Sequence, residues 1–456
     1  MPYRDIVVTL IIFGSLPVCL TRPWIGILMW SWIGYMNPHR LTWSFAYTLP
    51  FALVVALATL IGLLFTRERK PLPRTIEVYL LLALWLLFSI TTFFAFEPAG
   101  AWDQYDKVSK ILLVSFVTML LFQETQKLKM LLYVIAISIG FYGLKGGIWA
   151  IGTGGANQVL GPPDSFISGN TEIGLAINMV LPILLLLSRF ETRRWMKLSL
   201  RAAFFFGIFG SIFTYSRGAF LGLGLVLTLI FVKSRAKFAL IPLAIVVALF
   251  GKSLVPEQWL NRMGTIQTYE QDGSANMRLN SWWVSYQLAL DNPIIGAGFR
   301  PFTPAVYLRY SPDEKWNDWQ DAHSIYFQVL AEHGFTGLAL YMALIASTLI
   351  SLRRVKRRAR GNPSLEFHGA TAQMLEVSLL GFLVTGAFLS MSYFDLFFHL
   401  VAITVMLKVL VLQEAPAPVP VVARPAPASP VGARPPGRGP VIAPVRRPAL
   451  PSRTEG

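Results

Sequence analysis

Long apolar runs recur along this chain of 456 residues, and they restrict its fold more than any other feature. Each run is roughly 15 to 20 residues long, about the length of helix that crosses the hydrocarbon core of a bilayer. Only helices and closed barrels satisfy their backbone hydrogen bonds in lipid, and these runs lack the polar–apolar alternation of barrel strands. The sequence therefore predicts an all-α, polytopic membrane protein.

The distribution of charge agrees with this class. The formal net charge is +16, yet only 14% of the residues are charged. The lysines and arginines form short clusters beside apolar runs, as the positive-inside rule describes. We therefore expect membrane lipids, and no nucleic acid, as the partner of this positive charge. The single cysteine, Cys19, lies in an apolar run and excludes a disulfide framework.

The positive clusters alternate along the chain and set its organisation. They predict about twelve transmembrane helices, or about thirteen if the two short N-terminal pieces, Ile6–Leu20 and Trp24–Met36, both cross. Five regions result: short membrane segments and a loop (1–48), a transmembrane bundle (49–254), a large periplasmic loop (255–334), C-terminal transmembrane helices (335–412) and a disordered cytoplasmic tail rich in proline and arginine (413–456).

Some boundaries follow from the same alternation. The chain is expected to cross the membrane at 238–254, before the large loop, and at Ala372–Met391, after it. The charged stretch Glu97–Lys107 is expected to be an outside loop between two spans.

The large loop is expected to contain amphipathic helices. Between Asn276 and Leu290 the apolar residues recur at helical spacing, and Asn292-Pro293 ends the pattern. Such a helix would lie on the membrane surface or on the bundle. A second short helix is expected to begin near Asp321 as its N-cap and to run through His323 to Gly334.

Arginines in polar segments are candidates for binding an anion. Arg217 occupies a short turn between two apolar runs, and Arg278 and Arg300 lie in the large loop. Together they would suit a phosphate or pyrophosphate, whereas each alone could bind lipid headgroups or form surface ion pairs. The chain has no Gly-rich phosphate loop, Asp-x-Asp pair or zinc-type His/Cys spacing, so we expect neither a metal nor a cofactor.

His323 is the candidate catalytic residue. It stands beside Asp321 where the polar loop returns to the membrane, nine residues before Glu332. A neutral imidazole there could accept a proton from an attacking hydroxyl near neutral pH. The alternative is a structural histidine that only donates a hydrogen bond or packs the loop.

Several blocks resemble the O-antigen ligase and polymerase superfamily of bacterial envelope enzymes. The blocks are Tyr215–Phe220, the stretch from Arg278 to Gly298 and the stretch from His323 to Gly337. The segment from Asn170 to Pro182 is similar to a further family segment. The stretch from Met36 to Trp43 resembles the branch of exosortase-associated O-glycosylation ligases.

The resemblance implies a GT-C-like fold and a metal-independent glycan transfer in the bacterial inner membrane. The donor would be a glycan on undecaprenyl diphosphate, and the acceptor a hydroxyl of the lipid A-core or of a protein, on the periplasmic face. His323 would be catalytic, Arg217, Arg278 and Arg300 would bind the diphosphate, and Asp321, Glu332 and Asn170 would support them.

Two other functions stay open from the sequence. A polymerase of polysaccharide repeat units would differ only in its acceptor. A lipid or glycan transporter belongs to another class and is typically marked by ionisable groups in mid-span and by pseudo-symmetric halves. Here the polar residues gather in one loop, and the sequence shows no internal repeat.

Overall fold

The structure is a computed structural model that describes residues 3–68, 70–233, 273–312 and 319–414, with three single positions beyond them. The predicted span at 238–254, the first part of the large loop and the tail from residue 415 onward lie outside these ranges. The chain divides into two units, Met1–Ala415 and Pro416–Gly456, and the following description concerns the first.

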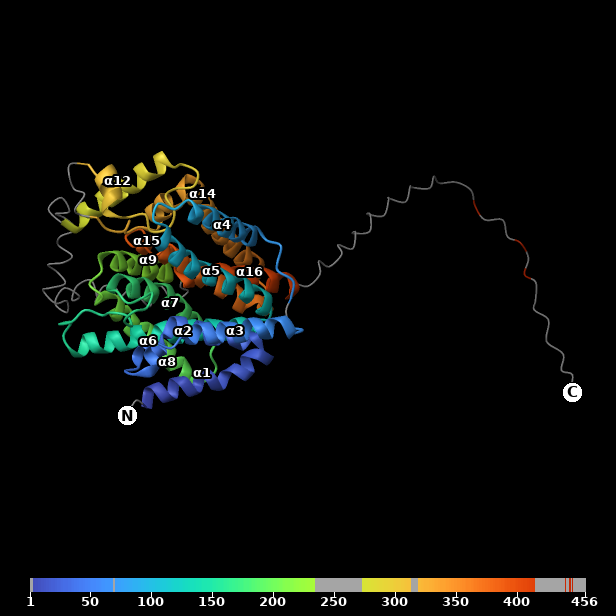
Figure 1. Ribbon diagram of the computed structural model, residues 1–456. Coiled ribbons are helices and arrows are strands. Elements are labelled where there is room, and N and C mark those ends of the chain that lie inside the picture. Colours follow the sequence, from blue (N-terminus) through green and yellow to red (C-terminus); the bar gives the residue numbers. More distant parts are fainter. Residues whose placement is uncertain are drawn as a thin grey trace. The chain divides into compact units, whose positions relative to one another are not determined.

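Helices make up all regular structure in the described ranges (Figure 1). They are α1 (Tyr3–Thr21), α2 (Pro23–Met36), α3 (Phe51–Phe65), α4 (Ile76–Phe93), α5 (Pro98–Leu121), α6 (Thr125–Gly152), α7 (Asn170–Phe190), α8 (Arg194–Ile212), α9 (Arg217–Lys233), α12 (Gly273–Asp291), α13 (Pro304–Tyr310), α14 (Ile325–Ala359), α15 (Glu366–Gly386) and α16 (Asp395–Glu414). Short 3-10 turns lie at Pro38–Leu41, Phe45–Tyr47 and Pro363–Leu365.

Among the described residues, eight helices are long and apolar enough to cross a membrane. They are α1, α4, α6, α7, α8, α14, α15 and α16, and α3 is a shorter apolar helix. This confirms a polytopic helical membrane protein, while the number of about twelve spans stays a prediction. The membrane-length windows of α7 and α16 are 83% and 78% buried, against 17% in α1, so α7 and α16 form the inside of the bundle.

The first two helices run antiparallel. A single residue joins them, and the Asp5 carboxylate near the start of α1 accepts backbone N–H bonds from Ser44 and Ala46, both at 3.0 Å, in the loop that follows α2. The other end of α1 packs on α3, where a Cβ on Gly62 would lie 2.5 Å from the Leu20 carbonyl oxygen. Of these two helices, only α1 is long and apolar enough to cross a membrane, so whether α2 also crosses stays a prediction.

Three predicted boundaries are wrong. Glu97–Lys107 is not a loop, because Pro98 begins α5 and its missing N–H costs nothing in a first turn. Asp321 does not cap a helix, because His323 has a left-handed φ of 46°, and α14 begins only after Ser324. The span predicted to reach Met391 ends at Gly386, so a polar connection of residues 387–394 precedes α16.

Helix α14 contains one sharp kink. Gly334 has φ 66° and ψ −169°, which interrupts the helix where the predicted short helix was expected to stop. The first part of α14 lies beneath α12 (Figure 1), and the second part continues to Ala359. The kink therefore separates the part of α14 that belongs to the polar segment from a membrane-length part.

Candidate functional site

A cavity of about 680 Å³ opens at the end of the bundle where the large loop lies. Residues from α5, α7 and α14 line it, together with residues from four connections: 153–169, the α12–α13 loop, the α13–α14 connection and the α15–α16 connection. Its charged lining comprises Lys107, Asp164, Glu172, Arg300, Asp321 and Glu332. Seven segments of the chain thus bring cations and carboxylates together around one cavity.

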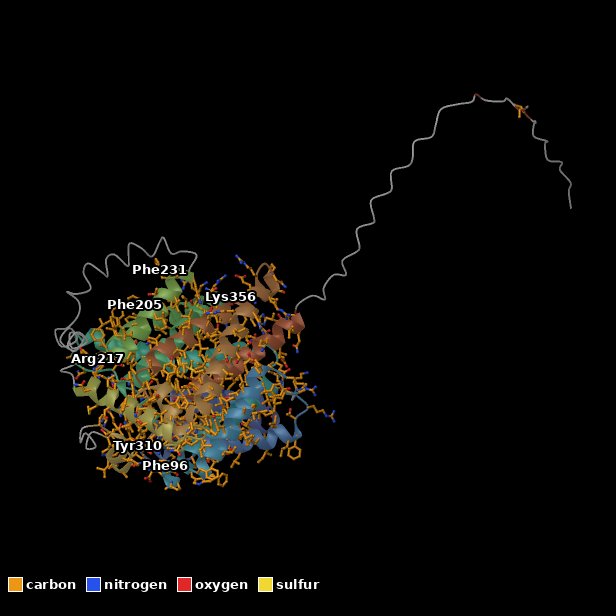
Figure 2. The ribbon with its side chains drawn as sticks, turned by 90° about the horizontal axis from the view of Figure 1, so that it is seen from above. Phe96, Phe205, Arg217, Phe231, Tyr310 and Lys356 are labelled. Atoms are coloured by element: carbon orange, nitrogen blue, oxygen red, sulfur yellow. The ribbon has the colours of Figure 1, made fainter. Side chains whose placement is uncertain are left out.

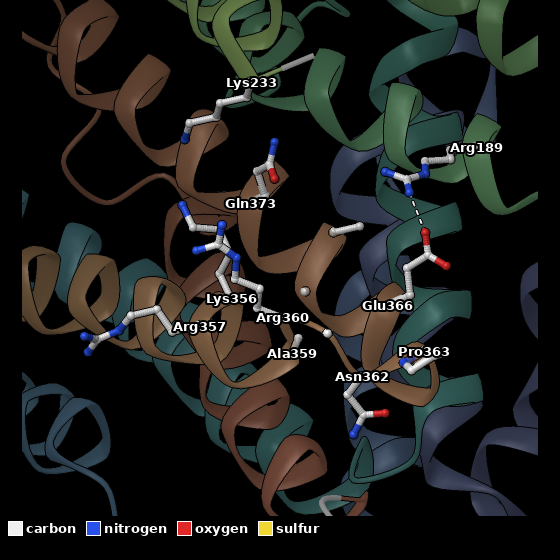
Figure 3. Close-up of a pocket in the computed structure, with 13 residues that line it drawn as sticks. Arg189, Lys233, Lys356, Arg357, Ala359, Arg360, Asn362, Pro363, Glu366 and Gln373 are labelled. Carbon is white, nitrogen blue, oxygen red and sulfur yellow. Dashed lines mark hydrogen bonds and ion pairs between the residues drawn. The ribbon is translucent and has the colours of Figure 1, made fainter. Parts of the chain in front are cut away.

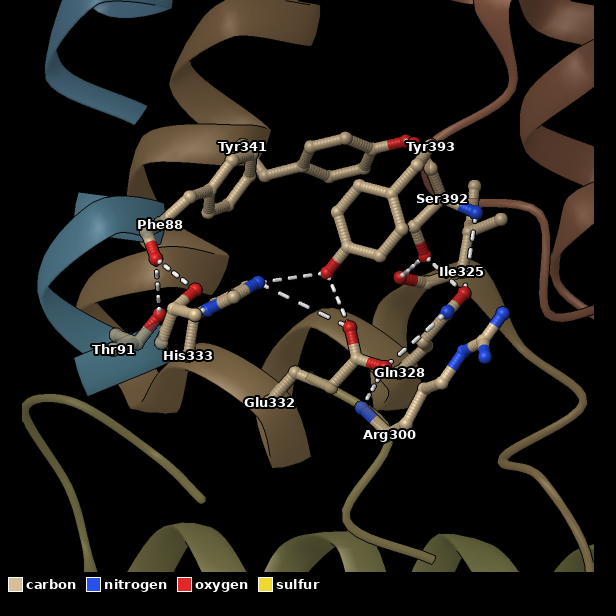
Figure 4. Close-up of polar contacts among 11 residues, drawn as sticks. Phe88, Thr91, Arg300, Ile325, Gln328, Glu332, His333, Tyr341, Ser392 and Tyr393 are labelled. Atoms are coloured by element: carbon tan, nitrogen blue, oxygen red, sulfur yellow. Dashed lines mark hydrogen bonds and ion pairs between the residues drawn. The ribbon is translucent and has the colours of Figure 1, made fainter. Parts of the chain in front are cut away.

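Glu332 is the most buried carboxylate of this cavity, with 2% of the residue exposed. Its Oε1 accepts the backbone N–H of Arg300 at 3.2 Å and a side-chain N–H of Gln328 at 3.4 Å. The Tyr393 hydroxyl donates to its Oε2 and lies 2.8 Å from the His333 Nε2 (Figure 4). Glu332 therefore fixes the backbone of the loop that carries Arg300.

The Gly-rich turn before Arg300 docks onto the kink of α14. The backbone N–H groups of Ala297 and Gly298 donate to the carbonyls of Ala331 and Glu332, both at 2.9 Å. In return the Phe335 N–H donates to the Pro293 carbonyl at 2.9 Å. These bonds use backbone groups that the kink removes from the helical ladder. The turn and the kink therefore form one rigid unit that positions Arg300.

His323 adjoins the wall of the cavity. Its backbone N–H donates to the Ser390 Oγ at 2.8 Å, and both Ser390 and Asp321 line the cavity. Burial lowers the pKa of the His323 imidazole, the charge of Arg278 lowers the pKa further, and Asp321 acts in the opposite direction. The ring is therefore neutral near pH 7, as a general base requires.

The three predicted arginines occupy different positions. Arg300 lines the cavity, and a Cβ on Gly100 of α5 would lie 3.7 Å from its Cδ. Arg278 lies in α12, close enough to influence His323. Arg217 begins α9, at the edge of the molecule away from Lys356 (Figure 2). Of the three, only Arg300 lines this cavity, where Lys107 is the second cation.

Asn170 supports the turn that precedes Arg217. It is the first residue of α7, and its Nδ2 donates to the Thr214 carbonyl at 3.0 Å. Asn178, two turns further along α7, donates from Nδ2 to the Ala219 carbonyl at 2.8 Å. The two amides hold the backbone on both sides of Arg217. Asn178 was not predicted, although it lies within the Asn170-to-Pro182 segment of the resemblance.

Residues 202–342 match the family described as O-Antigen ligase. The chain thus contains an O-antigen ligase domain, which supports the predicted assignment to the O-antigen ligase superfamily. Residues 3–192 match a second family, described as Family of unknown function (DUF5935). No curated protein matches the chain. The O-antigen ligase domain contains Arg217, Arg278, Arg300, His323 and Glu332, whereas the resemblance to the exosortase-associated branch stays a prediction.

The α15–α16 connection completes the site from outside the matched O-antigen ligase domain. Besides Ser390, it contributes Ser392, whose Oγ donates to the Gln328 Oε1 at 2.8 Å, and Tyr393, which bonds Glu332. These residues were not predicted, because the sequence placed part of this connection inside a span. The polar stretch from Ser390 to Ser392 between two apolar runs was the signal that could have revealed it.

Left-handed backbone conformations occur at several residues in or beside the cavity. In the described part of the chain, five residues other than glycine have a left-handed φ: Asn37, Asp164, Tyr215, Arg300 and His323. Asp164 and Arg300 line the cavity, and His323 adjoins it. Such conformations cost about 1–3 kcal/mol each and persist where the surrounding structure imposes them, commonly at functional sites.

A glycine substitution tests the docked turn. Gly296 has φ +64°, and an added Cβ would lie 2.5 Å from the backbone nitrogens of His333 and Gly334. Gly154 has a similar φ of +60° but open space around it, so Gly154→Ala carries only the conformational cost of about 1–2 kcal/mol. We expect Gly296→Ala to lower the melting temperature of the purified protein clearly more than Gly154→Ala does. Equal decreases would contradict the close contact of turn and kink.

Proposed function

We propose that this protein is a glycan ligase that acts on a lipid-linked donor. It transfers a glycan from undecaprenyl diphosphate to an acceptor hydroxyl, on the periplasmic face of a bacterial inner membrane. The observation that carries the proposal is the cavity that the O-antigen ligase domain lines together with residues outside it, which combines Arg300 and Lys107 with a neighbouring His323. Cations suit a diphosphate, and a neutral imidazole suits an acceptor hydroxyl.

The proposed reaction needs one proton acceptor and one leaving group. The acceptor oxygen attacks the anomeric carbon of the donor sugar while its proton passes to His323. The bond between that carbon and the diphosphate oxygen breaks, and the diphosphate keeps the electron pair. In this scheme Arg300 and Lys107 in the cavity neutralise the charge of the diphosphate, with Arg217 and Arg278 as the further predicted donor-binding arginines, so no metal ion is required.

The surface of α12 is a second argument for a lipid-linked donor. Leu279, Trp283, Tyr286 and Leu290 recur along one side of the helix, and between 41% and 49% of each residue is exposed. The opposite side packs on α14 and the loop before it, where the Trp282 Nε1 donates to the Ala322 carbonyl at 2.9 Å. An exposed apolar stripe beside a polar cavity suits a carrier with a long apolar chain and a charged head.

The acceptor is tested with purified protein and a labelled, carrier-linked glycan. Lipid A-core, a protein substrate and a second carrier-linked glycan are supplied in separate reactions, and the products are analysed by size and linkage. A ligase transfers label to the lipid A-core or to the protein. Label found only in lengthened carrier-linked glycan would instead identify a polymerase and contradict the proposal.

The membrane sidedness is tested by a matched pair of cysteines in a Cys19→Ser background. Ser311 lies after α13 at the cavity end, and Ser364 lies between α14 and α15 at the far end. We expect an impermeant thiol reagent that reaches the periplasm to label Ser311→Cys before the inner membrane is opened, and Ser364→Cys only afterwards. The reverse pattern would place the site in the cytoplasm and exclude the proposed reaction.

A further inference from the structure

A second cavity, of about 740 Å³, lies at the other end of the bundle (Figure 3). Five cations line it, from the ends of α7, α9 and α14: Arg189, Lys233, Lys356, Arg357 and Arg360. Lys356 follows the Gly334 kink by about 22 residues, or roughly 33 Å of helix. The full thickness of a bilayer core therefore separates this cavity from the candidate active site.

This cavity has more cations than carboxylates that pair with them. Glu366 pairs with Arg189 at 2.5 Å. Glu376, which is 5% exposed, pairs with Lys233 at 2.8 Å and with Lys356 at 3.2 Å. Glu376 also pairs with Arg353, at 2.9 Å.

Two further arginines have no such partner. Within the described ranges, neither Arg357 nor Arg360 forms an ion pair with a carboxylate. In Figure 3, Lys356 and Arg360 lie together near the space into which Lys233 extends, while Arg357 points to the other side. Converging cations with a net positive charge stabilise an anion placed between them.

The positive-inside rule explains positive charge at a membrane end, but it does not require the cations to converge on a hollow. Here small residues form much of the wall, including Ala359, Gly361 and Gly369. The connection after Arg189 leads to Trp195, which is 62% exposed and typical of the membrane interface. The cavity is therefore placed at the depth of lipid headgroups.

We propose that this basic cavity binds the phosphate group of an anionic membrane lipid. Basic pockets between transmembrane helices are suited to such headgroups, because the guanidinium groups bind phosphate oxygens and the helices face the acyl chains. The site is separate from the proposed glycan transfer and does not depend on it. Its role is to bind lipid at the far side of the bundle.

The test measures thermal unfolding of the full-length protein in detergent, after removal of bound lipid. Phosphatidylglycerol, phosphatidylcholine and inorganic phosphate are added in separate experiments. We expect phosphatidylglycerol to raise the melting temperature by about 2 to 4 °C, and phosphatidylcholine to leave it unchanged. A rise with inorganic phosphate but none with phosphatidylglycerol would indicate a soluble phosphate compound and overturn the lipid assignment.

Two double variants provide the matched comparison. Lys356→Gln with Arg360→Gln removes two cations of the basic cavity, one helical turn apart. Arg354→Gln with Arg358→Gln removes two cations of the same helix that line a different cavity, beside Lys408. Only the first pair should abolish the shift caused by phosphatidylglycerol. An equal loss in both pairs, or no loss in the first, would overturn the site.

The single variant Arg360→Gln provides a second test that remains usable if the double variant does not fold. Arg360 forms no ion pair with a described carboxylate, so its removal leaves the Glu376 cluster intact. The melting temperature without lipid should stay near that of the unaltered protein. The shift caused by phosphatidylglycerol should fall by at least half, and a full shift would contradict a role for Arg360 in the site.

Discussion

Replacing His323 with glutamine is expected to lower the rate of glycan transfer by about a hundred- to ten-thousandfold, the usual contribution of a positioned general base. Glutamine keeps a similar length and can donate a hydrogen bond, but it cannot accept and hold the proton. The fold should tolerate the change, because the backbone of His323, not its ring, bonds Ser390. His368→Gln, the same exchange at the far end of the bundle, should leave transfer unchanged.

The pH dependence of kcat/KM distinguishes His323 as a general base from His323 as a residue that only packs the loop. The ring must be neutral to accept a proton, so kcat/KM should rise with pH through the His323 pKa, which burial and Arg278 hold below its ordinary value of about 6.5, and then level off. Arg278→Gln should move the rising limb to higher pH, and Asp321→Asn should move it to lower pH. If His323→Gln keeps most of the transfer activity, the imidazole is not the base. The same conclusion would follow if neither Arg278→Gln nor Asp321→Asn shifts the rising part of the pH profile.

Loss of the arginines gives the second large effect. Arg300→Ala and Arg217→Ala are each expected to lower transfer by about ten- to a hundredfold, since a charge-assisted hydrogen bond contributes roughly 1.5–3 kcal/mol. Lysine at either position keeps the charge but not the planar, two-pronged geometry, so it should rescue only partly.

Arg309 offers the matched control for these arginines. It lies in α13, is well exposed, and pairs with the Asp291 carboxylate at 3.1 Å. An exposed pair contributes little, so Arg309→Ala should retain transfer. Full activity in Arg300→Ala and Arg217→Ala would refute their role, whereas equal losses in all three variants would indicate a general effect of surface charge.

The membrane helices could be predicted because lipid allows few alternatives. Apolar runs of membrane length must become helices, and the end of α12 at Asp291 agrees with the restriction that Pro293 places on its predecessor. The turn at Gly296 and Gly298 was also visible in the sequence. What it contacts was not, because the partners, Ala331 and Glu332, lie more than 30 residues further along the chain.

The composition of the site was harder to predict, because it depends on contacts between distant segments. Arg300 and His323 were identified, but Lys107 was assigned to a loop and the α15–α16 connection to a span. Both errors have the same origin: local charge and hydropathy do not show which helix ends meet. The left-handed φ angles of Arg300 and His323 could not be predicted either, since such angles are uncommon for any residue other than glycine.

Transfer in proteoliposomes tests the central claim most directly. The purified protein is reconstituted with a glycan-linked undecaprenyl diphosphate and an acceptor, in the presence of a chelator, and free carrier diphosphate and glycosylated acceptor are measured together. We expect one carrier diphosphate to be released for each glycan transferred, and His323→Gln to abolish both. A glycan that changes leaflet while still attached to its carrier, with no diphosphate released, would identify a transporter and contradict the account.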